Sequence, residues 1–393
     1  MVEPEHCHFY VQRKMRYCKM TVKKGRSFCG EHEPTKGVAT VDERIPCPLD
    51  PGHTIYRSKL SKHLKVCNAK IEPESQPSYI VKGINLGEPV SCNNDQPLSN
   101  IDQQIIDNVL KKIEDAYAKL PAIEEEILTH EVLKTELENS TYGAETRRHL
   151  LQTASLLGHL KQADLVNQNT CYIEFGAGKG KLTYWLGQSV QNIPDSTVLL
   201  IDRSSHRHKK DNKLKNDDYH VKVIRIRADI ADLKLNNISE IKETPHKVAI
   251  AKHICGAASD LTLRCMTNSI KDDKTTKAGV VVAFCCHHRC EYSHYVGYEF
   301  LKKEGFTPDE FPILCKIASW ATCGIKLNNE NDSTEREKIG QKVKMLLNWG
   351  RLEYLESFGF KCKLVYYIKS DSTLENVCIV GKLNRNEASD QSK

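Results

Sequence analysis

The 393-residue sequence lacks any apolar run approaching the ~20 residues that a membrane-spanning helix needs. This absence excludes a helical membrane protein, and we expect no membrane partner. The first six residues contain neither a basic segment nor an apolar one, which excludes a secretory signal peptide. No internal repeat is visible. We therefore expect an intracellular protein, in either the nucleus or the cytoplasm.

Excess positive charge is also lacking over most of the chain. Residues 1–70 hold 14 Lys and Arg against 7 Asp and Glu, whereas the remaining residues hold 43 against 44. The formal net charge of +6 is thus concentrated in the first fifth of the sequence. A small basic segment ahead of a near-neutral body indicates an appendage that binds a polyanion.

Cysteine, by contrast, is abundant, with 16 residues. In a reducing compartment, clustered Cys and His bind metal more often than they form disulfides. Two sets, spaced C-x10-C-x10-C-x2-H and C-x5-H-x9-H-x3-C, each supply the four ligands of a closed zinc site. The ligands are Cys7, Cys18, Cys29 and His32 in the first set, and Cys47, His53, His63 and Cys67 in the second.

We expect two structural zinc ions, because such short segments have no core and metal binding must supply most of their folding free energy. In the first set, His6 or His8 could replace a ligand. In the second, His63 and Cys67 lie four residues apart, on one face of a helix predicted over residues 59–67.

Basic and aromatic residues are interleaved with the first set of ligands. Such a mixture can contact phosphates and stack on bases. A solvated basic loop explains the pattern equally well. The residues are Arg13, Lys14, Arg16, Lys19, Lys23, Lys24 and Arg26, with Tyr10, Tyr17 and Phe28.

Composition and periodicity divide the chain into segments. We predict zinc modules over residues 1–36 and 44–70, a Pro-rich linker over 71–99, a helical segment over 100–143, an α/β domain over 144–385 and a tail over 386–393. Helices are predicted over residues 101–117, 122–138 and 146–160.

Short β-branched runs then alternate with helical ones. The predicted strands cover residues 171–175, 197–202, 221–226, 247–252, 278–285, 362–368 and 377–382. Strands alternating with helices predict a doubly wound α/β sheet. The last two strands are joined by a polar turn and form a terminal antiparallel hairpin. This is the arrangement associated with class I, Rossmann-like methyltransferases.

A glycine-rich loop follows the first predicted strand, with the sequence Glu174-Phe175-Gly176-Ala177-Gly178-Lys179-Gly180. Its glycines allow positive φ and close approach of a ligand to the backbone. Dinucleotide-binding folds use similar loops. Here, however, an acidic residue opens the loop, and Glu174 would repel a pyrophosphate but suits a cofactor with a sulfonium and an ammonium group.

Two further strand ends carry acids. Asp202 can accept hydrogen bonds from both ribose hydroxyls, and Asp229 with Ile230 can grip an adenine. Together with Gly176, Gly178 and Gly180, these residues predict a site for S-adenosylmethionine. An ordinary glycine turn with strand-end acids facing water explains each feature singly, but not all three in register.

The motifs resemble those of a known family. The C-x5-H-x9-H-x3-C module resembles the CHHC finger shared with a minor-spliceosome component. Its pairing with a Cys-Cys-Cys-His finger and the loop Glu174–Leu182 is similar to the eukaryotic tRNA position-4 ribose methyltransferases. Two long motifs extend the resemblance: Lys252-His253-Ile254-Cys255-Gly256 with Asp260–Cys265, and Cys285-Cys286-His287-His288-Arg289-Cys290. It covers both fingers and the catalytic domain, and leaves out the linker and the tail after Arg385.

This resemblance implies 2′-O-methylation of nucleotide 4 in the acceptor stem of certain tRNAs. A ribose hydroxyl is a poor nucleophile that benefits from a base or from stabilisation of the developing alkoxide. Lys252 and His253 end the fourth strand, beside the expected position of the methyl group. We expect Lys252 to stabilise the alkoxide or, if desolvated, to act as a neutral base. His253 is the alternative base, and Lys252 could instead only pair with a phosphate or carboxylate.

The residues after the fifth strand are predicted to face the substrate. Cys285, His287 and His288 would wall the pocket of the target nucleotide, and Arg289 would hold a phosphate. A third metal there is less favoured, because ligands so close in sequence rarely converge on one ion. Trp320 would stack on a base or belong to the core.

Two absent motifs favour oxygen as the methylated atom. No acidic-Pro-Pro-aromatic tetrapeptide follows the fourth strand, as in exocyclic-amine methylation, and no Pro-Cys pair supplies the thiolate of cytosine C5 enzymes. Other hypotheses are methylation of another RNA or of a protein, and an RNA-binding zinc protein with an inactive methyltransferase fold. The intact set of Glu174, Gly176, Gly178 and Asp202 disfavours the inactive fold.

Overall fold

The computed structural model describes residues 6–11, 16–18, 20–22, 25–29, 32, 44–67, 77–90, 96–206, 209–215, 221–242, 244–271, 277–322 and 330–384. The chain divides into two compact units, Met1–Gln76 and Pro77–Lys393. In the described part of the chain, no helix combines the length and apolar character needed to cross a membrane.

The first unit contains two small antiparallel strand pairs. Strands β1 (Tyr10–Val11) and β2 (Arg16–Tyr17) form one pair, and β3 (Arg44–Cys47) and β4 (Asp50–Tyr56) form the other. Helix α1 (Leu60–Val66) follows the second pair and confirms the helix predicted there. Cys7, Cys18 and Cys29 form a small buried cluster, and Val22 and Phe28 are the described hydrophobic residues packed against it. So small a core cannot hold a fold without a metal ion.

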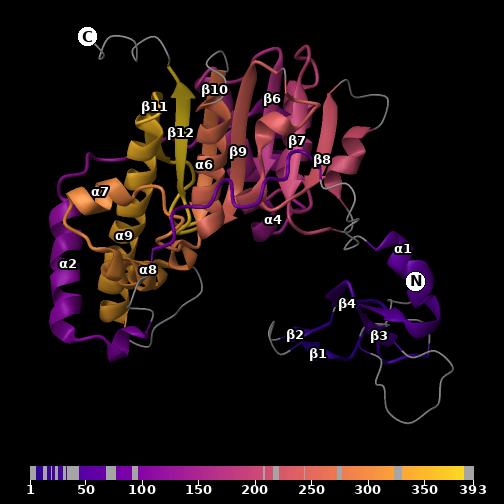
Figure 1. Cartoon of the computed structure of the whole chain (residues 1–393), viewed down its shortest axis with the longest axis horizontal. Helices are drawn as coiled ribbons and strands as arrows, with labels where there is room; N and C mark the ends of the chain where they lie inside the picture. Colours follow the sequence, from indigo (N-terminus) through magenta and orange to yellow (C-terminus); the bar gives the residue numbers. More distant parts are fainter. Residues whose placement is uncertain are drawn as a thin grey trace. The chain divides into compact units, whose positions relative to one another are not determined.

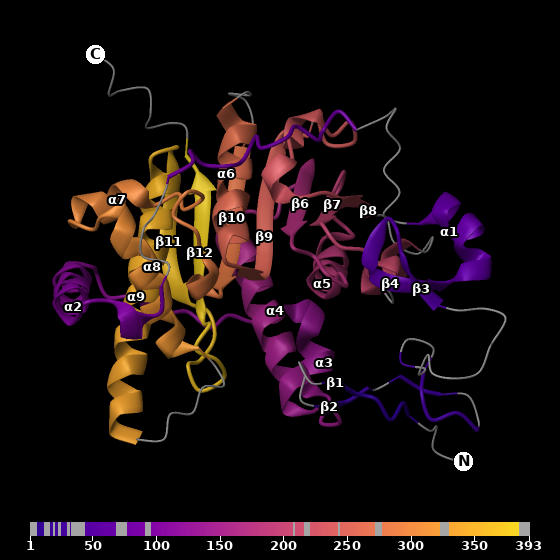
Figure 2. The same cartoon turned by 60° about the horizontal axis from the view of Figure 1, so that its bottom comes forward.

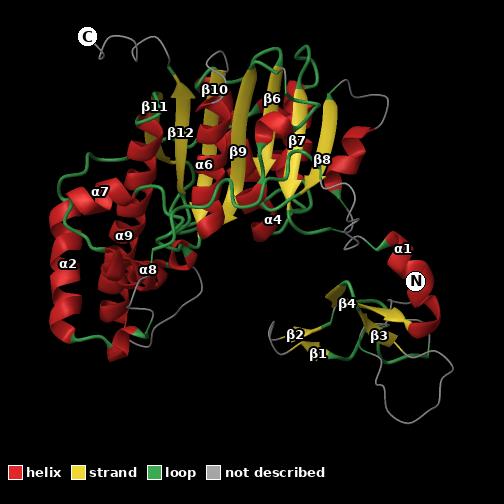
Figure 3. Ribbon diagram, viewed as in Figure 1, coloured by secondary structure: helices red, strands yellow, loops and turns green. Residues whose placement is uncertain are grey.

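The second unit is built on an eight-stranded mixed sheet in the order β5-β11-β12-β10-β9-β6-β7-β8 (Figures 1 and 3). Strands β6 to β10 are parallel where they pair, and β12 runs antiparallel between β10 and β11. The bounds are β5 (Glu124–Glu125), β6 (Thr170–Phe175), β7 (Thr197–Asp202), β8 (Lys222–Arg227), β9 (His246–Cys255), β10 (Lys277–Cys285), β11 (Phe360–Tyr366) and β12 (Val377–Leu383). The class I methyltransferase sheet and its terminal hairpin are confirmed.

Burial on both faces explains why the central strands are continuous apolar runs. Along β10, Val280, Val282 and Phe284 join the core on one face, and Val281 and Ala283 join the core on the other. Helices α4 and α5 cover one face, and α6 and α9 cover the other (Figure 2). A third cluster joins α2, α7, α8 and α9.

The helices of this unit are α2 (Gln103–Tyr117), α3 (Lys134–Glu138), α4 (Ala144–Gln162), α5 (Lys181–Val190), α6 (Ala257–Lys271), α7 (Tyr298–Lys303), α8 (Phe311–Ala318) and α9 (Glu330–Glu356). Helices α2 and α4 correspond to predicted helices. The described residues between β7 and β8, and between β8 and β9, form only short 3₁₀ turns where helices were expected.

The helix predicted over residues 122–138 is wrong. Its first part forms β5, which pairs with β11, and the Glu126 amide donates to the Tyr366 carbonyl oxygen at 3.0 Å. Those backbone groups therefore bond to the sheet edge rather than within a helix. Only Lys134–Glu138, preceded by a 3₁₀ turn, is helical.

Part of the predicted linker over residues 71–99 also packs on the rest of the second unit. The Val81 and Asn85 amides donate to the carbonyl oxygens of Asp232 and Ala231, at 2.7 and 2.9 Å. The buried Asn85 side chain donates to the Ile230 and Leu233 carbonyl oxygens at 2.6 and 2.7 Å. Residues 77–90 therefore pack against the segment that follows β8, because their backbone groups form hydrogen bonds with it.

A buried ion pair ties α6 to α9. The Arg351 guanidinium donates to both carboxylate oxygens of Asp260, at 3.0 and 2.8 Å, and both side chains are at most 1% exposed. Arg351 also donates to Asn348 Oδ1 at 3.0 Å and lies 4.8 Å from the centre of the Phe284 ring. The pair therefore sits directly under the end of β10.

Candidate active site and metal sites

The glycine-rich loop leaves the carboxyl end of β6 and leads into α5. Gly176, Gly178 and Gly180 have φ values of 65°, 52° and 67°, a region that residues with a Cβ rarely adopt. A Cβ at Gly176 or Gly178 would meet no atom within 4 Å, so the space beside both residues is open to a ligand. A Cβ at Gly180 would lie 2.4 Å from the Asp211 carboxylate, so packing requires this glycine.

Glu174 lies beneath the loop and is only 5% exposed. One oxygen, Oε2, accepts hydrogen bonds from the Thr183 amide, at 2.8 Å, and from the Thr183 hydroxyl. Burial raises the pKa of Glu174 to about 7, while the bonds from Thr183 and the nearby charge of Lys252 oppose the rise. Glu174 thus anchors the first turn of α5 and, in its ionised form, places a negative charge under the predicted cofactor site.

Asp202 ends β7 and contacts the loop. Its Oδ2 accepts from the Gly178 amide at 2.7 Å, and its Oδ1 accepts from the Ser204 amide at 2.7 Å. The carboxylate is 13% exposed. Asp229 follows β8, and its Oδ1 accepts from the Ala231 amide at 3.0 Å beside the buried Ile230. The register of β6, β7 and β8 brings the loop and both acids to one edge of the sheet.

Lys252 lies near the end of β9, which extends beyond β6. Its Nζ donates to the His149 carbonyl oxygen and to Thr153 Oγ1, both at 3.1 Å. Burial lowers the pKa of Lys252 to about 8, and the negative charge of Glu174 opposes the shift. The amine thus exchanges its proton close to neutral pH, as catalysis by a neutral base requires.

His253 is an extra residue in the ladder between β9 and β10. Lys252 pairs with Ala283 and Ile254 pairs with Phe284, so His253 forms a bulge, with φ at 59°. Positive φ on a non-glycine residue is strained and concentrates at functional sites. Burial and the charge of Lys252 lower the pKa of His253 to about 4, so its imidazole is neutral and weakly basic.

Sequence reasoning missed the partners of this pair on α4. Gln152 is fully buried, and its Oε1 lies 3.0 Å from His253 Nε2 and 3.2 Å from His149 Nδ1. Its Nε2 hydrogen-bonds to no described residue. An amide oxygen that accepts from Nε2 leaves His253 Nδ1 as the basic nitrogen. The periodicity of α4 in the sequence does not show that Gln152 is buried beside His253. Its burial in the structure is what identifies it as a partner.

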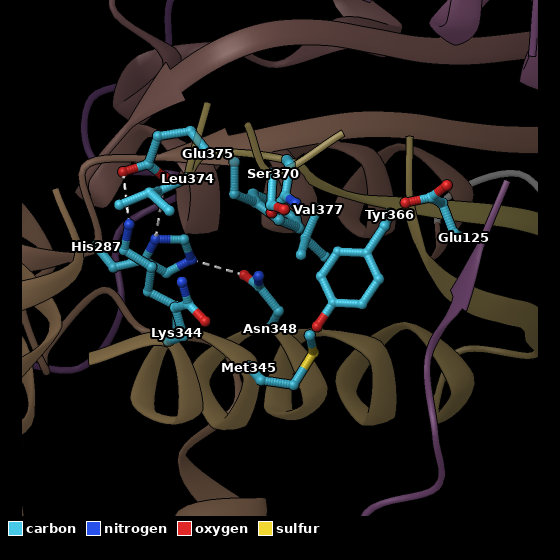
Figure 4. Close-up of a pocket in the computed structure, with 13 residues that line it drawn as sticks. Glu125, His287, Lys344, Met345, Asn348, Tyr366, Ser370, Leu374, Glu375 and Val377 are labelled. Atoms are coloured by element: carbon cyan, nitrogen blue, oxygen red, sulfur yellow. Dashed lines mark hydrogen bonds and ion pairs between the residues drawn. The ribbon is translucent and has the colours of Figure 1, made fainter. Parts of the chain in front are cut away.

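The residues after β10 divide into buried and exposed groups. His287 is buried, with Nε2 2.8 Å from Asn348 Oδ1 and Nδ1 4.0 Å from Glu375 (Figure 4). Burial and the charge of Arg351 hold the pKa of His287 well below its usual value. It walls a cavity of about 280 Å³ between α9 and the β11–β12 turn. His288 and Arg289 are exposed at the same edge.

Two other predicted substrate residues lie in different surroundings. Cys285, at the end of β10, is 5% exposed and contacts Cys255. Trp320 packs against the core cluster of α2, α7, α8 and α9, with the Arg336 guanidinium 5.6 Å from its ring centre. Trp320 is partly buried there, which favours the core alternative, and its stacking on a base stays a prediction.

The first predicted zinc set converges. Sulfur atoms of Cys7, Cys18 and Cys29 and a ring nitrogen of His32 all lie within 4.8 Å of one another. The Phe9 ring stacks on the His32 ring, with centroids 4.0 Å apart. Among the described residues, His32 completes the set rather than His6 or His8. Three sulfurs and one nitrogen at this spacing fit a tetrahedral zinc ion.

The second set converges for the three ligands whose side chains are described. The sulfurs of Cys47 and Cys67 lie 3.7 Å apart, and His63 Nε2 is 3.2 Å from the Cys47 sulfur. The edge of a zinc–thiolate tetrahedron with ~2.3 Å bonds is about 3.8 Å. The predicted fourth ligand, His53, lies in β4, and its side chain is outside the described residues.

Aromatic side chains are exposed on the first module. Tyr10 and Tyr17 pair across β1 and β2 with ring centroids 5.2 Å apart, and they are 41% and 64% exposed. Phe9 is 42% exposed. Of the predicted basic residues, Arg13, Lys14, Lys19, Lys23 and Lys24 lie outside the described residues.

Comparison with known families gives three matches along the chain. Residues 151–382 match the family described as methyltransferase TRM13. Residues 5–33 match the CCCH zinc finger in TRM13 protein, and residues 44–68 match the U11-48K-like CHHC zinc finger.

Three curated proteins are similar over nearly their whole length. The mouse protein named tRNA:m(4)X modification enzyme TRM13 homolog is 32% identical, over 95% of this chain and 93% of its own. The human protein of the same name is 31% identical, over 97% and 95%. The tRNA:m(4)X modification enzyme TRM13 of Scheffersomyces stipitis is 33% identical, over 93% and 98%.

Proposed function

The chain belongs to the methyltransferase TRM13 family, and from that premise we propose that it transfers a methyl group from S-adenosylmethionine to the ribose 2′-oxygen of nucleotide 4 in the acceptor stem of certain tRNAs. The observation that carries this proposal is the meeting of two sites at one sheet edge. The open glycine loop with Asp202 lies beside Lys252, whose pKa of about 8 suits proton transfer from a hydroxyl.

The residues present fit the cofactor. The open space beside Gly176 and Gly178 lets a ligand approach the backbone, and Asp202 lies at the loop to accept ribose hydroxyls. Glu174, whose pKa burial raises to about 7, would place a negative charge below a sulfonium in its ionised form. When bound, S-adenosylmethionine would supply the electrophilic methyl group, and Asp229 and Ile230 would flank its adenine.

Lys252 is proposed as the base rather than His253. A pKa of about 8 makes the neutral amine a much stronger proton acceptor than an imidazole with a pKa of about 4. Bonds to the His149 carbonyl oxygen and to Thr153 hold the amine in place. We propose that His253 and Gln152 position the bulge, and that Arg289 binds a phosphate of the tRNA.

The first test is to map the methylated atom. Full-length protein is incubated with bulk tRNA and labelled S-adenosylmethionine, and the label is located by nuclease mapping. We expect one label, on the 2′-oxygen of nucleotide 4. A synthetic tRNA with deoxyribose at nucleotide 4 is the matched control, and it should take up no label. Label on a base, on another RNA or on protein would refute the proposal. If calorimetry detects no binding of S-adenosylmethionine, the remaining hypothesis is an RNA-binding protein with an inactive methyltransferase fold.

The second test concerns the CHHC module, for which we propose a role in holding tRNA. Cys47→Ser removes a buried ligand, so the protein should carry one zinc ion instead of two and lose the folding free energy that the metal supplies. We expect the KM for tRNA to rise by about tenfold, a loss of about 1.4 kcal/mol of binding, with kcat little changed. Zinc content by mass spectrometry and steady-state kinetics measure both effects.

Cys362→Ser is the matched control, because Cys362 is a half-buried thiol on β11, outside both zinc sets. This variant should keep two zinc ions and the normal KM. If Cys47→Ser lowers only thermal stability, the module is structural and does not contact the substrate.

A further inference from the structure

Three thiols meet at the ends of two neighbouring strands. Cys255 ends β9, Cys285 ends β10, and Cys286 follows directly with φ at 53°. The three sulfur atoms all lie within 4.8 Å of one another. Those of Cys255 and Cys285 are 2.8 Å apart. A methyl transfer to a hydroxyl needs no thiol, so the proposed reaction does not account for this cluster.

The short distance between the Cys255 and Cys285 sulfurs distinguishes a zinc site from a pair of thiols placed to form a disulfide. A zinc thiolate would place neighbouring sulfurs about 3.8 Å apart, and Cys47 and Cys67 do lie 3.7 Å apart. The 2.8 Å between Cys255 and Cys285 is too short for that edge and lies closer to the ~2.05 Å of a disulfide.

The backbone also suits a covalent bond between these two residues. Cys255 and Cys285 are direct partners in the parallel ladder of β9 and β10. Neighbouring strands lie about 4.8 Å apart, which is inside the ~4.4–6.8 Å range of Cα separations seen in disulfides. Both sulfurs also contact the same short stretch of β9, at the carbonyl oxygens of His253 and Ile254.

The two thiols differ in reactivity. A hydrogen bond from Cys285 lowers the pKa of Cys255 to about 6, and the Arg289 guanidinium adds to this effect. Cys255 is therefore mostly thiolate at neutral pH, and it is partly exposed, as a nucleophile must be. The same hydrogen bond and burial raise the pKa of Cys285, so it stays a thiol next to the thiolate.

We propose that Cys255 and Cys285 are an oxidation site that forms a reversible disulfide on reaction with a hydroperoxide. The Cys255 thiolate attacks one peroxide oxygen, the O–O bond breaks, and a sulfenic acid forms while the other oxygen leaves as water or an alcohol. The Cys285 sulfur then attacks the Cys255 sulfur, loses its proton, and a second water leaves. The peroxide gains two electrons and the two thiols lose them. A dithiol reductant reverses the reaction.

The disulfide would act on the predicted catalytic bulge. The Cys255 sulfur lies 3.4 Å from the His253 carbonyl oxygen, so a disulfide that moves this sulfur alters a contact with the bulge itself. The disulfide would also pull together the ends of β9 and β10, and the end of β9 directly follows Lys252. A misplacement of about 1 Å costs on the order of a hundredfold in rate, so we expect methyl transfer to slow by at least about tenfold. This effect on rate rests on the proposed function, whereas the disulfide itself does not.

The test uses the full chain with both zinc sites loaded. The protein is treated with one equivalent of hydrogen peroxide, remaining thiols are alkylated, and a non-reducing digest is analysed by mass spectrometry. We expect a peptide pair joined through Cys255 and Cys285 that disappears after dithiothreitol. A chromogenic chelator reports any zinc released from the two modules, which separates their oxidation from that of the strand pair.

Variants separate the outcomes. Cys255→Ser and Cys285→Ser should each lose the linked peptide and resist inactivation, while Cys362→Ser should behave like the unchanged protein. If the linked peptide forms but the rate of methyl transfer does not change, the proposed effect of the disulfide on the catalytic site is wrong. If Cys255 and Cys285 are both alkylated after peroxide treatment and no linked peptide forms, the proposal is wrong. It is also wrong if the protein binds a third equivalent of zinc that protects these two thiols. The peptide remains measurable even if the protein does not methylate tRNA.

Discussion

Lys252→Ala is expected to lower the rate of methyl transfer by about 100- to 10,000-fold, the usual contribution of a general base. The affinity for S-adenosylmethionine should stay within about twofold, because uncharged alanine removes no group from the glycine loop or from Asp202. Single-turnover rates with saturating tRNA and calorimetry with the cofactor measure the two quantities. Near-normal turnover would remove Lys252 from the mechanism.

The pH dependence distinguishes the two roles of Lys252. Its pKa of about 8 means that the neutral amine increases about tenfold per pH unit below pH 8 and becomes dominant above it. If the neutral amine takes the hydroxyl proton, the rate should rise with pH and level off above about 8. If the charged amine only stabilises the alkoxide, the rate should instead fall above that pH. We expect the rise.

Lys252→Arg provides a second comparison. Arginine keeps the positive charge and cannot give up its proton in this pH range. A base role predicts that this variant is as inactive as the alanine variant, whereas an electrostatic role predicts partial activity. His253→Gln is the companion change, and we expect a smaller loss, because an imidazole with a pKa of about 4 is a weak base.

The strands of the sheet were predictable because burial on both faces leaves a continuous apolar run. The observed bounds of β6, β7 and β10 differ from the predicted ones by at most one residue. The helix over residues 122–138 was wrong for the opposite reason. Its apolar residues suit a helix locally, but the pairing of Glu124 with Val365 across 241 positions decides the structure. Such long-range pairing leaves no local pattern.

The candidate site also has residues that the sequence predicted and residues that it did not. Glu174, Asp202 and Lys252 follow apolar runs, so strand ends alone bring them to one edge. The amide of Gln152 and the thiol of Cys255 join them through the packing of α4 and the register of β9, which no spacing reveals. Gly180 carries the same signal in sequence as Gly176, yet the Asp211 carboxylate rather than a ligand occupies the space beside it.

Sequence also gave no sign of the ion pair that supports this edge, since its partners stand 91 residues apart. Asp260→Ala would leave the Arg351 guanidinium buried and unpaired beneath Phe284. Breaking a buried pair on one side costs about 3–5 kcal/mol, a large part of the ~5–15 kcal/mol that stabilises a typical domain. We therefore expect the midpoint of urea unfolding of the catalytic unit to fall sharply, measured by tryptophan fluorescence.

The comparison variant is Asp164→Asn, which removes the charge from the exposed pair between Asp164 and Lys382, 2.7 Å long against 2.8 Å for the buried pair. Asparagine tolerates the φ of 52° at this position, whereas alanine would be strained. That change should cost less than about 1 kcal/mol, since exposed pairs contribute little. Replacing both Asp260 and Arg351 by apolar residues should recover much of the loss, because the cost comes from the unpaired charge and not from the missing contact. If Asp260→Ala destabilises no more than Asp164→Asn, the pair does not hold α6 to α9, and the placement of the β10 end must depend on apolar packing alone.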